Sequence, residues 1–202
     1  MNTKYPVVYL KRENIVLSLR ELADAAKADV KAALRETGAE KVNVIAWSRA
    51  GLAARIVAWE MPNKIASVTT VCTPHRGLRT PEKAMGKPAI KCWARMLGRG
   101  PYFRLAVKTL SPDYMRVFNE MYPNAEGVFY QSCACAMTPA DDEKLASANS
   151  IISIFDGEND GVVSVYSALW GQRGIVRRGV SHLQAGREIY DELIDSLAEN
   201  GL

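Results

Sequence analysis

Short runs of apolar, β-branched residues recur along the chain and predict buried strands. The runs are residues 5–10, 42–46, 65–72, 128–134 and 151–155. Segments with a helical spacing of apolar residues separate the first three, and strands that alternate with helices form parallel sheets with right-handed crossovers. The pattern therefore predicts an α/β protein with a mostly parallel sheet and helices on both faces.

The helix before residue 42 carries clear start and stop signals. Ser18 and Glu21 have the spacing of a capping box, in which the Ser side chain accepts from a free N–H and the Glu reaches back to the cap. Gly38 stands where the apolar repeat stops, as expected at a helix end. Further helices are predicted over residues 48–59, 112–122 and 182–200.

Residues 78–111 break this regular alternation. The segment is basic, and Gly and Pro residues interrupt its short amphipathic pieces. Large apolar side chains sit among the Lys and Arg residues, including those of Trp93, Leu97 and Phe103. We expect this segment to be an insertion within a single domain that spans residues 1–202.

The length, composition and net charge of the chain narrow the class of protein. A chain of 202 residues, 48% hydrophobic and 24% charged, is enough for one domain with a core. The net charge is +4, and the Lys and Arg residues are spread along the chain instead of forming a dense basic stripe. We therefore expect no nucleic-acid partner. No apolar run approaches the roughly 20 residues that span a bilayer. The first residues lack the order of a signal peptide, so a native Met1 predicts a cytoplasmic protein, whereas a trimmed chain leaves secretion open.

Four cysteines occur, and we expect all of them to be reduced thiols. No Cys-x-x-Cys pair is present, and Cys133 and Cys135 are too close in sequence for an ordinary disulfide. Two histidines do not complete a zinc site at the usual spacing, so we expect no metal and no cofactor. Cys72 and Cys133 lie in strand-like runs, which favours small buried side chains over reactive ones.

Ser48 lies between a predicted strand and a predicted helix. This is the context of a nucleophile elbow, a tight turn that holds a Ser hydroxyl above the edge of a sheet. Such a turn needs small residues two positions before and after the Ser, and here these are Ala46 and Ala50, with Gly51 next. The pattern fits equally well a Ser that only caps the following helix.

A Ser hydroxyl needs a base, and the chain offers two histidines. His75 directly follows a predicted strand, where a structural hydrogen-bonding role is expected. His182 lies far downstream, in agreement with the order Ser, acid, His. The acid that orients the base belongs between them, and spacing alone leaves Asp160, Glu158 and Asp156 as candidates, Asp160 first.

In these residues and in the segments around them, the chain resembles bacterial triacylglycerol lipases of the α/β-hydrolase superfamily. The matching stretches include the specific segments TPHRG and NDG and follow the family order. They are residues 37–52, 66–77, 114–132, 156–171 and 178–182. The resemblance implies an α/β-hydrolase fold and a triad of Ser48, Asp160 and His182.

The resemblance also implies that residues 78–111 form a helical lid region over an acyl pocket. An apolar surface on a basic segment suits an ester or lipid substrate and transient contact with a lipid interface. The substrate-binding residues expected on this basis are Trp47, Trp93, Leu97 and Phe103.

Three departures from the family pattern matter. The first strand leads into Lys11 and Arg12 instead of a His-Gly loop that supplies an oxyanion donor, which leaves the Arg49 N–H as the other expected donor. A helix and a strand are missing after it, which predicts a reduced sheet and a homodimer that covers the exposed edge. Gln184 replaces an acid two residues after His182, so no calcium is expected there.

Two functions of different classes remain open. The first is a serine esterase or lipase that forms an acyl-enzyme on Ser48, with passage of the acyl group to an alcohol as a variant. The second is a catalytically impaired binding protein of the same fold. The second reading rests on the oxyanion hole, because loss of one donor costs about 100- to 1000-fold in turnover.

Overall fold

The computed structural model describes residues 17–80, 107, 109, 111–185 and 187–202. Within them, four parallel strands form one sheet in the order β1-β2-β3-β4. The strands are β1 (Val42–Trp47), β2 (Ile65–Val71), β3 (Phe129–Ala136) and β4 (Arg173–Arg178). The predicted parallel α/β architecture is confirmed, and all carboxyl ends of these strands lie at one edge of the sheet.

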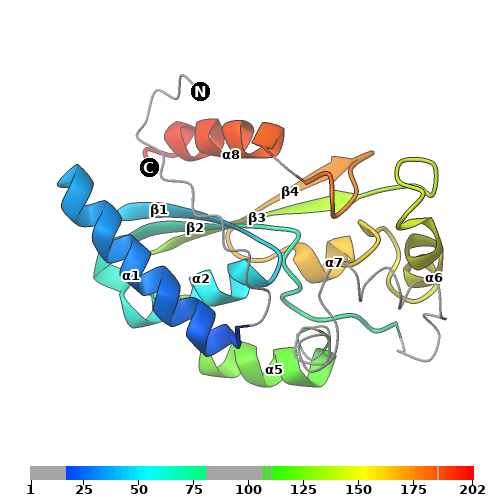
Figure 1. Cartoon of the computed structure of the whole chain (residues 1–202), viewed down its shortest axis with the longest axis horizontal. Coiled ribbons are helices and arrows are strands. Elements are labelled where there is room, and N and C mark those ends of the chain that lie inside the picture. The colour runs from blue at the N-terminus through cyan, green and yellow to red at the C-terminus, as the bar shows by residue number, and fades with distance from the viewer. Residues whose placement is uncertain (1–16, 81–106, 108, 110, 186) are drawn as a thin grey trace.

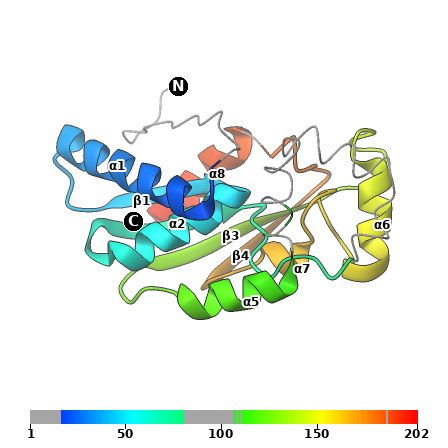
Figure 2. The ribbon, with the colours of Figure 1, turned by 60° about the horizontal axis from the view of Figure 1, so that its bottom comes forward.

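Helices cover both faces of this sheet, as predicted (Figure 1). Figure 2 shows α1 and α2 lying over one face, with α5 beside them, whereas α8 lies on the other face. Their bounds are α1 (Leu19–Thr37), α2 (Arg49–Glu60), α5 (Pro112–Met121) and α8 (Arg187–Glu199). A 3-10 turn (Pro62–Lys64) joins α2 to β2.

The alternation of side chains along β1 explains why both faces are covered. Val44 packs with the core beneath α1 and α2, whereas its neighbours Ile45 and Trp47 pack with the core beneath α8. On β3, Tyr130 faces the first core and Cys133 the second. Because successive strand side chains point to opposite faces of the sheet, each strand packs against the helices on both faces.

The predicted start and end of α1 are confirmed. Ser18 accepts from the N–H of Glu21, and the Glu21 carboxylate accepts from the N–H of Ser18 at 2.8 Å. Gly38 ends the helix in the left-handed conformation, with φ of 68°.

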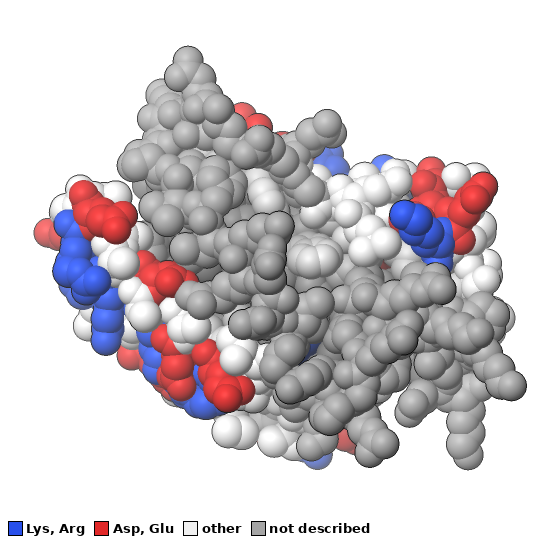
Figure 3. Space-filling model, viewed as in Figure 1, with Lys and Arg blue, Asp and Glu red and all other residues white. Residues whose placement is uncertain are grey.

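Charged side chains join α1 to the end of α2. Glu60 pairs with Arg20 and with Lys27. Figure 3 shows Lys and Arg side chains interspersed with Asp and Glu around α1 on the face in view. Exposed pairs of this kind contribute at most about 1 kcal/mol each, so the apolar face of α1 dominates its packing.

One predicted strand is wrong. Residues 151–155 belong to helix α6 (Ala146–Asp156), which has Ile152 buried and Ile154 exposed. A short apolar run does not separate a strand from a helix, and here the small residues before it extend the run into three helical turns. The amide of Asn149 fixes the helix by donating to the carbonyl of Met137 at 3.0 Å.

Two further boundaries differ from expectation. Strand β4 has a single apolar pair, Ile175 and Val176, within Arg and Gly residues, so its pattern did not predict an edge strand. The last helix begins at Arg187, and His182 lies in the turn before it instead of at its first position. A short helix, α7 (Val165–Ala168), precedes β4.

Two other predictions concern residues that the structure does not describe. They include the first strand, over residues 5–10, and most of the lid segment, over 81–106, 108 and 110. The assignment of residues 1–202 to one domain with a lid therefore stays a prediction. Among the described helices, none combines the length and the apolar character needed to cross a bilayer.

Candidate active site

Ser48 occupies the turn between β1 and α2, and its backbone has the conformation of an elbow. Its φ and ψ are 55° and −134°, and its side chain makes no capping hydrogen bond to α2. Ser18, which does cap a helix, has φ of −60° and accepts from Glu21. This contrast within one chain excludes the alternative that Ser48 is a simple helix cap.

Several hydrogen bonds hold Ser48 in this strained conformation. Its N–H donates to the carbonyl of Val71 at 2.8 Å, and its carbonyl accepts from the Thr73 hydroxyl at 2.8 Å. The N–H of Gly51 donates to the same carbonyl at 3.0 Å. A side chain at Gly51 would place Cβ 2.1 Å from the Thr73 Oγ1, so only Gly lets α2 approach β2 this closely.

The hydroxyl of Ser48 meets the ring of His182. Its Oγ lies 3.1 Å from Nε2, and the Nδ1 of His182 lies 2.8 Å from Oδ2 of Asp160. The side chains of His182 and Asp160 are each 1% exposed. Because an ionised carboxylate only accepts, Nδ1 carries the proton and Nε2 is free to accept from Ser48.

The backbone fixes this pair as well as the side chains. The N–H of His182 donates to the carbonyl of Asp160 at 2.9 Å. The other carboxylate oxygen of Asp160 accepts from the N–H groups of Val162 and Val163 at 2.9 and 2.7 Å. The ring of Trp47 lies 4.9 Å from that of His182 and covers it from β1.

The three candidate acids have separate partners. Asp160 contacts His182, as the resemblance implied. Asp156 accepts from the N–H and hydroxyl of Thr80, at 2.8 and 2.6 Å, and so holds the end of the segment that follows His75. Glu158 pairs with Arg178 on the surface. Spacing alone left this choice open, and the hydrogen bonds separate the three residues.

Polar side chains fix the turn that carries His182. The Ser181 hydroxyl donates to Asp142 at 2.7 Å, and the Gln184 amide donates to the carbonyl of Asp141 at 3.1 Å. The Gln184 side chain also accepts from the N–H of Ser181. The amide at position 184 therefore links two loops through hydrogen bonds.

His75 has the structural position that the sequence indicated. Its Nε2 lies 2.9 Å from the Thr70 hydroxyl, and its Nδ1 lies 3.3 Å from an Arg55 nitrogen. Burial, and then the positive charges of Arg55 and Arg76, hold the pKa of His75 well below its usual range. Arg55 stacks on the ring of Trp170 at 4.0 Å. His75 is thus a neutral, buried residue that anchors the loop after β2.

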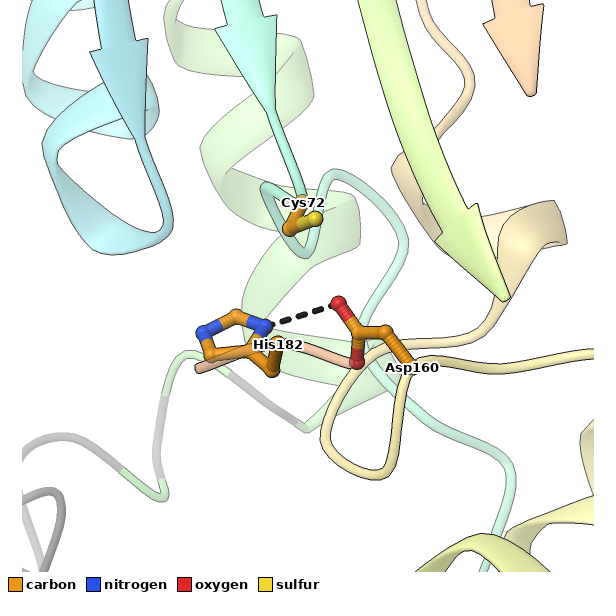
Figure 4. A group of neighbouring side chains, drawn as sticks. All are labelled: Cys72, Asp160 and His182. Carbon is orange, nitrogen blue, oxygen red and sulfur yellow. Dashed lines mark hydrogen bonds and ion pairs between the residues drawn. The ribbon is translucent and has the colours of Figure 1, made fainter. Parts of the chain in front are cut away.

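Among the described residues, three side chains of the types that can bind a metal ion lie together: Cys72, Asp160 and His182, with one ligand atom of each within 4.8 Å of the others. Figure 4 shows the thiol of Cys72 beside the hydrogen-bonded pair. Cys72 has a positive φ of 51° and is fully buried. The sequence missed this proximity, because its only signal was a Cys at the end of a strand. The free thiols expected at Cys72, Cys133 and Cys135 are present.

Two more of the predicted site residues, Trp47 and Arg49, lie in the described part of the chain. Trp47 lies against His182, as described above. The side chain of Arg49 donates to the carbonyl of Leu17 at 2.8 Å, and its N–H is at the first position of α2. The other predicted residues lie outside the described part of the chain, namely Lys11, Arg12, Trp93, Leu97 and Phe103.

Comparisons with known proteins identify the family of this chain. The model of the family described as the alpha/beta hydrolase fold matches residues 20–129, more than half of the chain. Curated triacylglycerol lipases of Pseudarthrobacter phenanthrenivorans and Burkholderia plantarii are each 33% identical to it over 116 residues, 48% of this chain. The chain spans only 36% and 32% of their lengths.

A solved structure has the same fold. The mature form of a Bacillus licheniformis lipase superposes with a TM-score of 0.68 at 20% sequence identity, over 83% of this chain and 69% of that one. At that identity the likeness concerns the fold. Together with the family match and the turn at Ser48, it leads to one conclusion: the chain belongs to the alpha/beta hydrolase fold family.

Proposed function

We propose that this protein hydrolyses carboxylic esters of the acylglycerol class through an acyl-enzyme on Ser48. The observation that carries the proposal is the unbroken line of hydrogen bonds from the Ser48 hydroxyl through His182 to Asp160. A positioned base that removes the proton of a Ser hydroxyl turns it into a nucleophile. The names of the two curated relatives, both triacylglycerol lipases, support this substrate class.

The proposed reaction gives each of the three side chains a role. Ser48 Oγ forms a bond to the ester carbonyl carbon while its proton passes to Nε2 of His182. His182 then gives that proton to the departing alcohol, and the acyl group stays on Ser48. Water attacks the acyl-enzyme, its proton passes to Nε2, and the carboxylic acid leaves as Ser48 regains a proton. Asp160 orients His182 and stabilises its positive charge in both halves.

The first N–H of α2, that of Arg49, is the donor we expect for the negative oxygen of the tetrahedral intermediate. It follows the nucleophile directly and begins a helix of 12 residues, whose N-terminus favours negative charge. We expect a backbone N–H of Lys11 or Arg12 to supply a second donor. An oxyanion hole with both donors predicts normal turnover, whereas a hole with a single donor predicts turnover about 100- to 1000-fold lower.

Labelling with a fluorophosphonate probe tests the proposal directly. Wild-type protein should be labelled at Ser48 in one-to-one stoichiometry, and the Ser48→Ala variant should not react. Wild-type protein should also hydrolyse p-nitrophenyl esters, and a series of acyl chain lengths would define the preferred substrate. Ester hydrolysis that is unchanged in Ser48→Ala would contradict the proposal.

Two other outcomes would favour a different function. No labelling of a folded wild-type protein would favour the binding protein without catalysis. An alkyl ester that forms when an alcohol is added would show transfer of the acyl group, because the alcohol then replaces water in the second half-reaction.

A further inference from the structure

Cys72 lies next to the two residues that assist Ser48. It directly follows β2, the strand between β1, which leads to Ser48, and β3. One ligand atom each of Cys72, Asp160 and His182 lie within 4.8 Å of one another. Figure 4 shows Cys72 near the hydrogen-bonded pair of His182 and Asp160. All three side chains are buried, so no bulk water separates them.

The backbone of Cys72 adopts a rare conformation. Among the described residues other than glycine, only Ser48 and Cys72 have positive φ. The N–H of Cys72 donates to the carbonyl of Cys133 at 2.8 Å, which holds the turn in place. A positive φ costs a residue with a side chain of order 1 kcal/mol or more, and such strain gathers at functional sites.

The thiol is a neutral donor throughout the working range of an esterase. The nearby Cys135 thiol lowers the pKa of Cys72, but burial and the charge of Asp160 outweigh it and raise that pKa to about 12. A neutral thiol is a weak nucleophile, so we assign Cys72 no covalent role, but its S–H is still a weak hydrogen-bond donor. The carboxylate of Asp160 is the charged acceptor beside it.

We propose that Cys72 is a positioning residue that donates its S–H to the carboxylate of Asp160 and holds it toward His182. The inference rests on the proposed function, in which Asp160 orients the base. Val162 and Val163 donate to Oδ1 of Asp160, and His182 donates to Oδ2. The thiol adds a donor from the turn after β2, a different part of the chain from the loop that carries Asp160.

Removing this donor has two predicted effects. A carboxylate with one donor fewer holds the imidazole less well in place, so kcat falls about three- to tenfold while KM stays within a factor of two. The same carboxylate concentrates more negative charge and stabilises the imidazolium more strongly. The acid limb of the pH profile of kcat/KM therefore moves to higher pH by about half a unit.

The described ionisable groups that face Cys72 from β3 and α8 stay neutral in this pH range. Cys135 on β3 and Tyr190 on α8 face Cys72, and the pKa of each is raised: that of Cys135 by the balance of its thiol contacts and burial, that of Tyr190 by burial. Trp47 on β1 does not ionise. A change in the acid limb thus reports on the pair of His182 and Asp160.

The experiment compares Cys72→Ala and Cys72→Ser with the wild type, using a p-nitrophenyl ester between pH 5 and 9. The Ala variant should show the lower kcat and the shifted acid limb, and the Ser variant should restore both, because its hydroxyl donates to the same carboxylate. Cys133→Ala removes a buried thiol of the same core cluster and is the matched control, with no expected shift.

The outcomes separate this inference from the proposed function. If Cys72→Ala lowers Tm but keeps the wild-type kcat and acid limb, the thiol only fills space and the inference is wrong. The same holds if Cys133→Ala shifts the acid limb equally. Activity that persists in Ser48→Ala would instead overturn the proposed function itself.

Discussion

The Ser48 hydroxyl lies 3.1 Å from Nε2 of His182, although 134 residues separate them in the chain. The relationship depends on a backbone that Ser rarely adopts, with φ of 55°. Two hydrogen bonds hold this strained turn: the Ser48 N–H donates to the carbonyl of Val71 at the end of β2, and the Thr73 hydroxyl donates to the Ser48 carbonyl. The reactive geometry is therefore maintained at the expense of local stability.

Relief of this strain should be measurable. Ser48→Gly and Ser48→Ala both lack the hydroxyl, but only Gly adopts positive φ without a steric penalty. We expect Ser48→Gly to be more stable than Ser48→Ala by about 1 kcal/mol, or roughly 2–4 °C in Tm. Thermal unfolding of the pair checks this, and equal Tm values would show that the turn is not strained.

Gly51→Ala should destabilise the protein by about 1–3 kcal/mol, because its Cβ would overlap Thr73. The displaced Thr73 would also release the carbonyl of Ser48. Denaturant unfolding measures the loss. The double variant with Thr73→Ala removes the nearest clash, so the two effects should not add. Strict additivity would place the cause of the destabilisation elsewhere.

The contact between Ser181 and Asp142 should support the position of His182. In Asp142→Ala the Ser181 hydroxyl loses its acceptor, and we expect kcat to fall about three- to tenfold as the turn loosens. Asp142→Asn keeps an acceptor oxygen and should retain most activity. Glu143→Ala, an exposed acid next in sequence, serves as the control. Equal losses in the Ala and Asn variants would point to charge instead of the hydrogen bond.

The low pKa of His75 should appear as a pH dependence of stability. Its folded pKa lies below the unfolded one, so the unfolded chain binds the proton first as the pH falls. The stability is complete above about pH 6.5 and is lost below it, by up to about 1.4 kcal/mol per pH unit. His75→Gln lacks this group, so its unfolding free energy should fall less steeply between pH 7.5 and 5.5. Parallel curves would contradict the assignment.

Local signals in the sequence determined several features correctly. The capping box at Ser18 and the stop at Gly38 act within one or two helical turns, so the residues themselves suffice. The strand, turn and helix around Ser48 are equally local. The order of Ser48 and His182 along the chain also needs no structure.

Only the tertiary structure decided the rest. The run at residues 151–155 fits a strand or a helix, and the contacts of Asn149 with Met137 and Asn159 fix it as a helix. Spacing left residues 156, 158 and 160 as competing candidates, and their partners, Thr80, Arg178 and His182, lie far away in sequence. The position of Cys72 beside Asp160 carried no local signal at all. Sequence patterns report on neighbours within a few residues, whereas these choices depend on hydrogen bonds that form only when distant segments pack together.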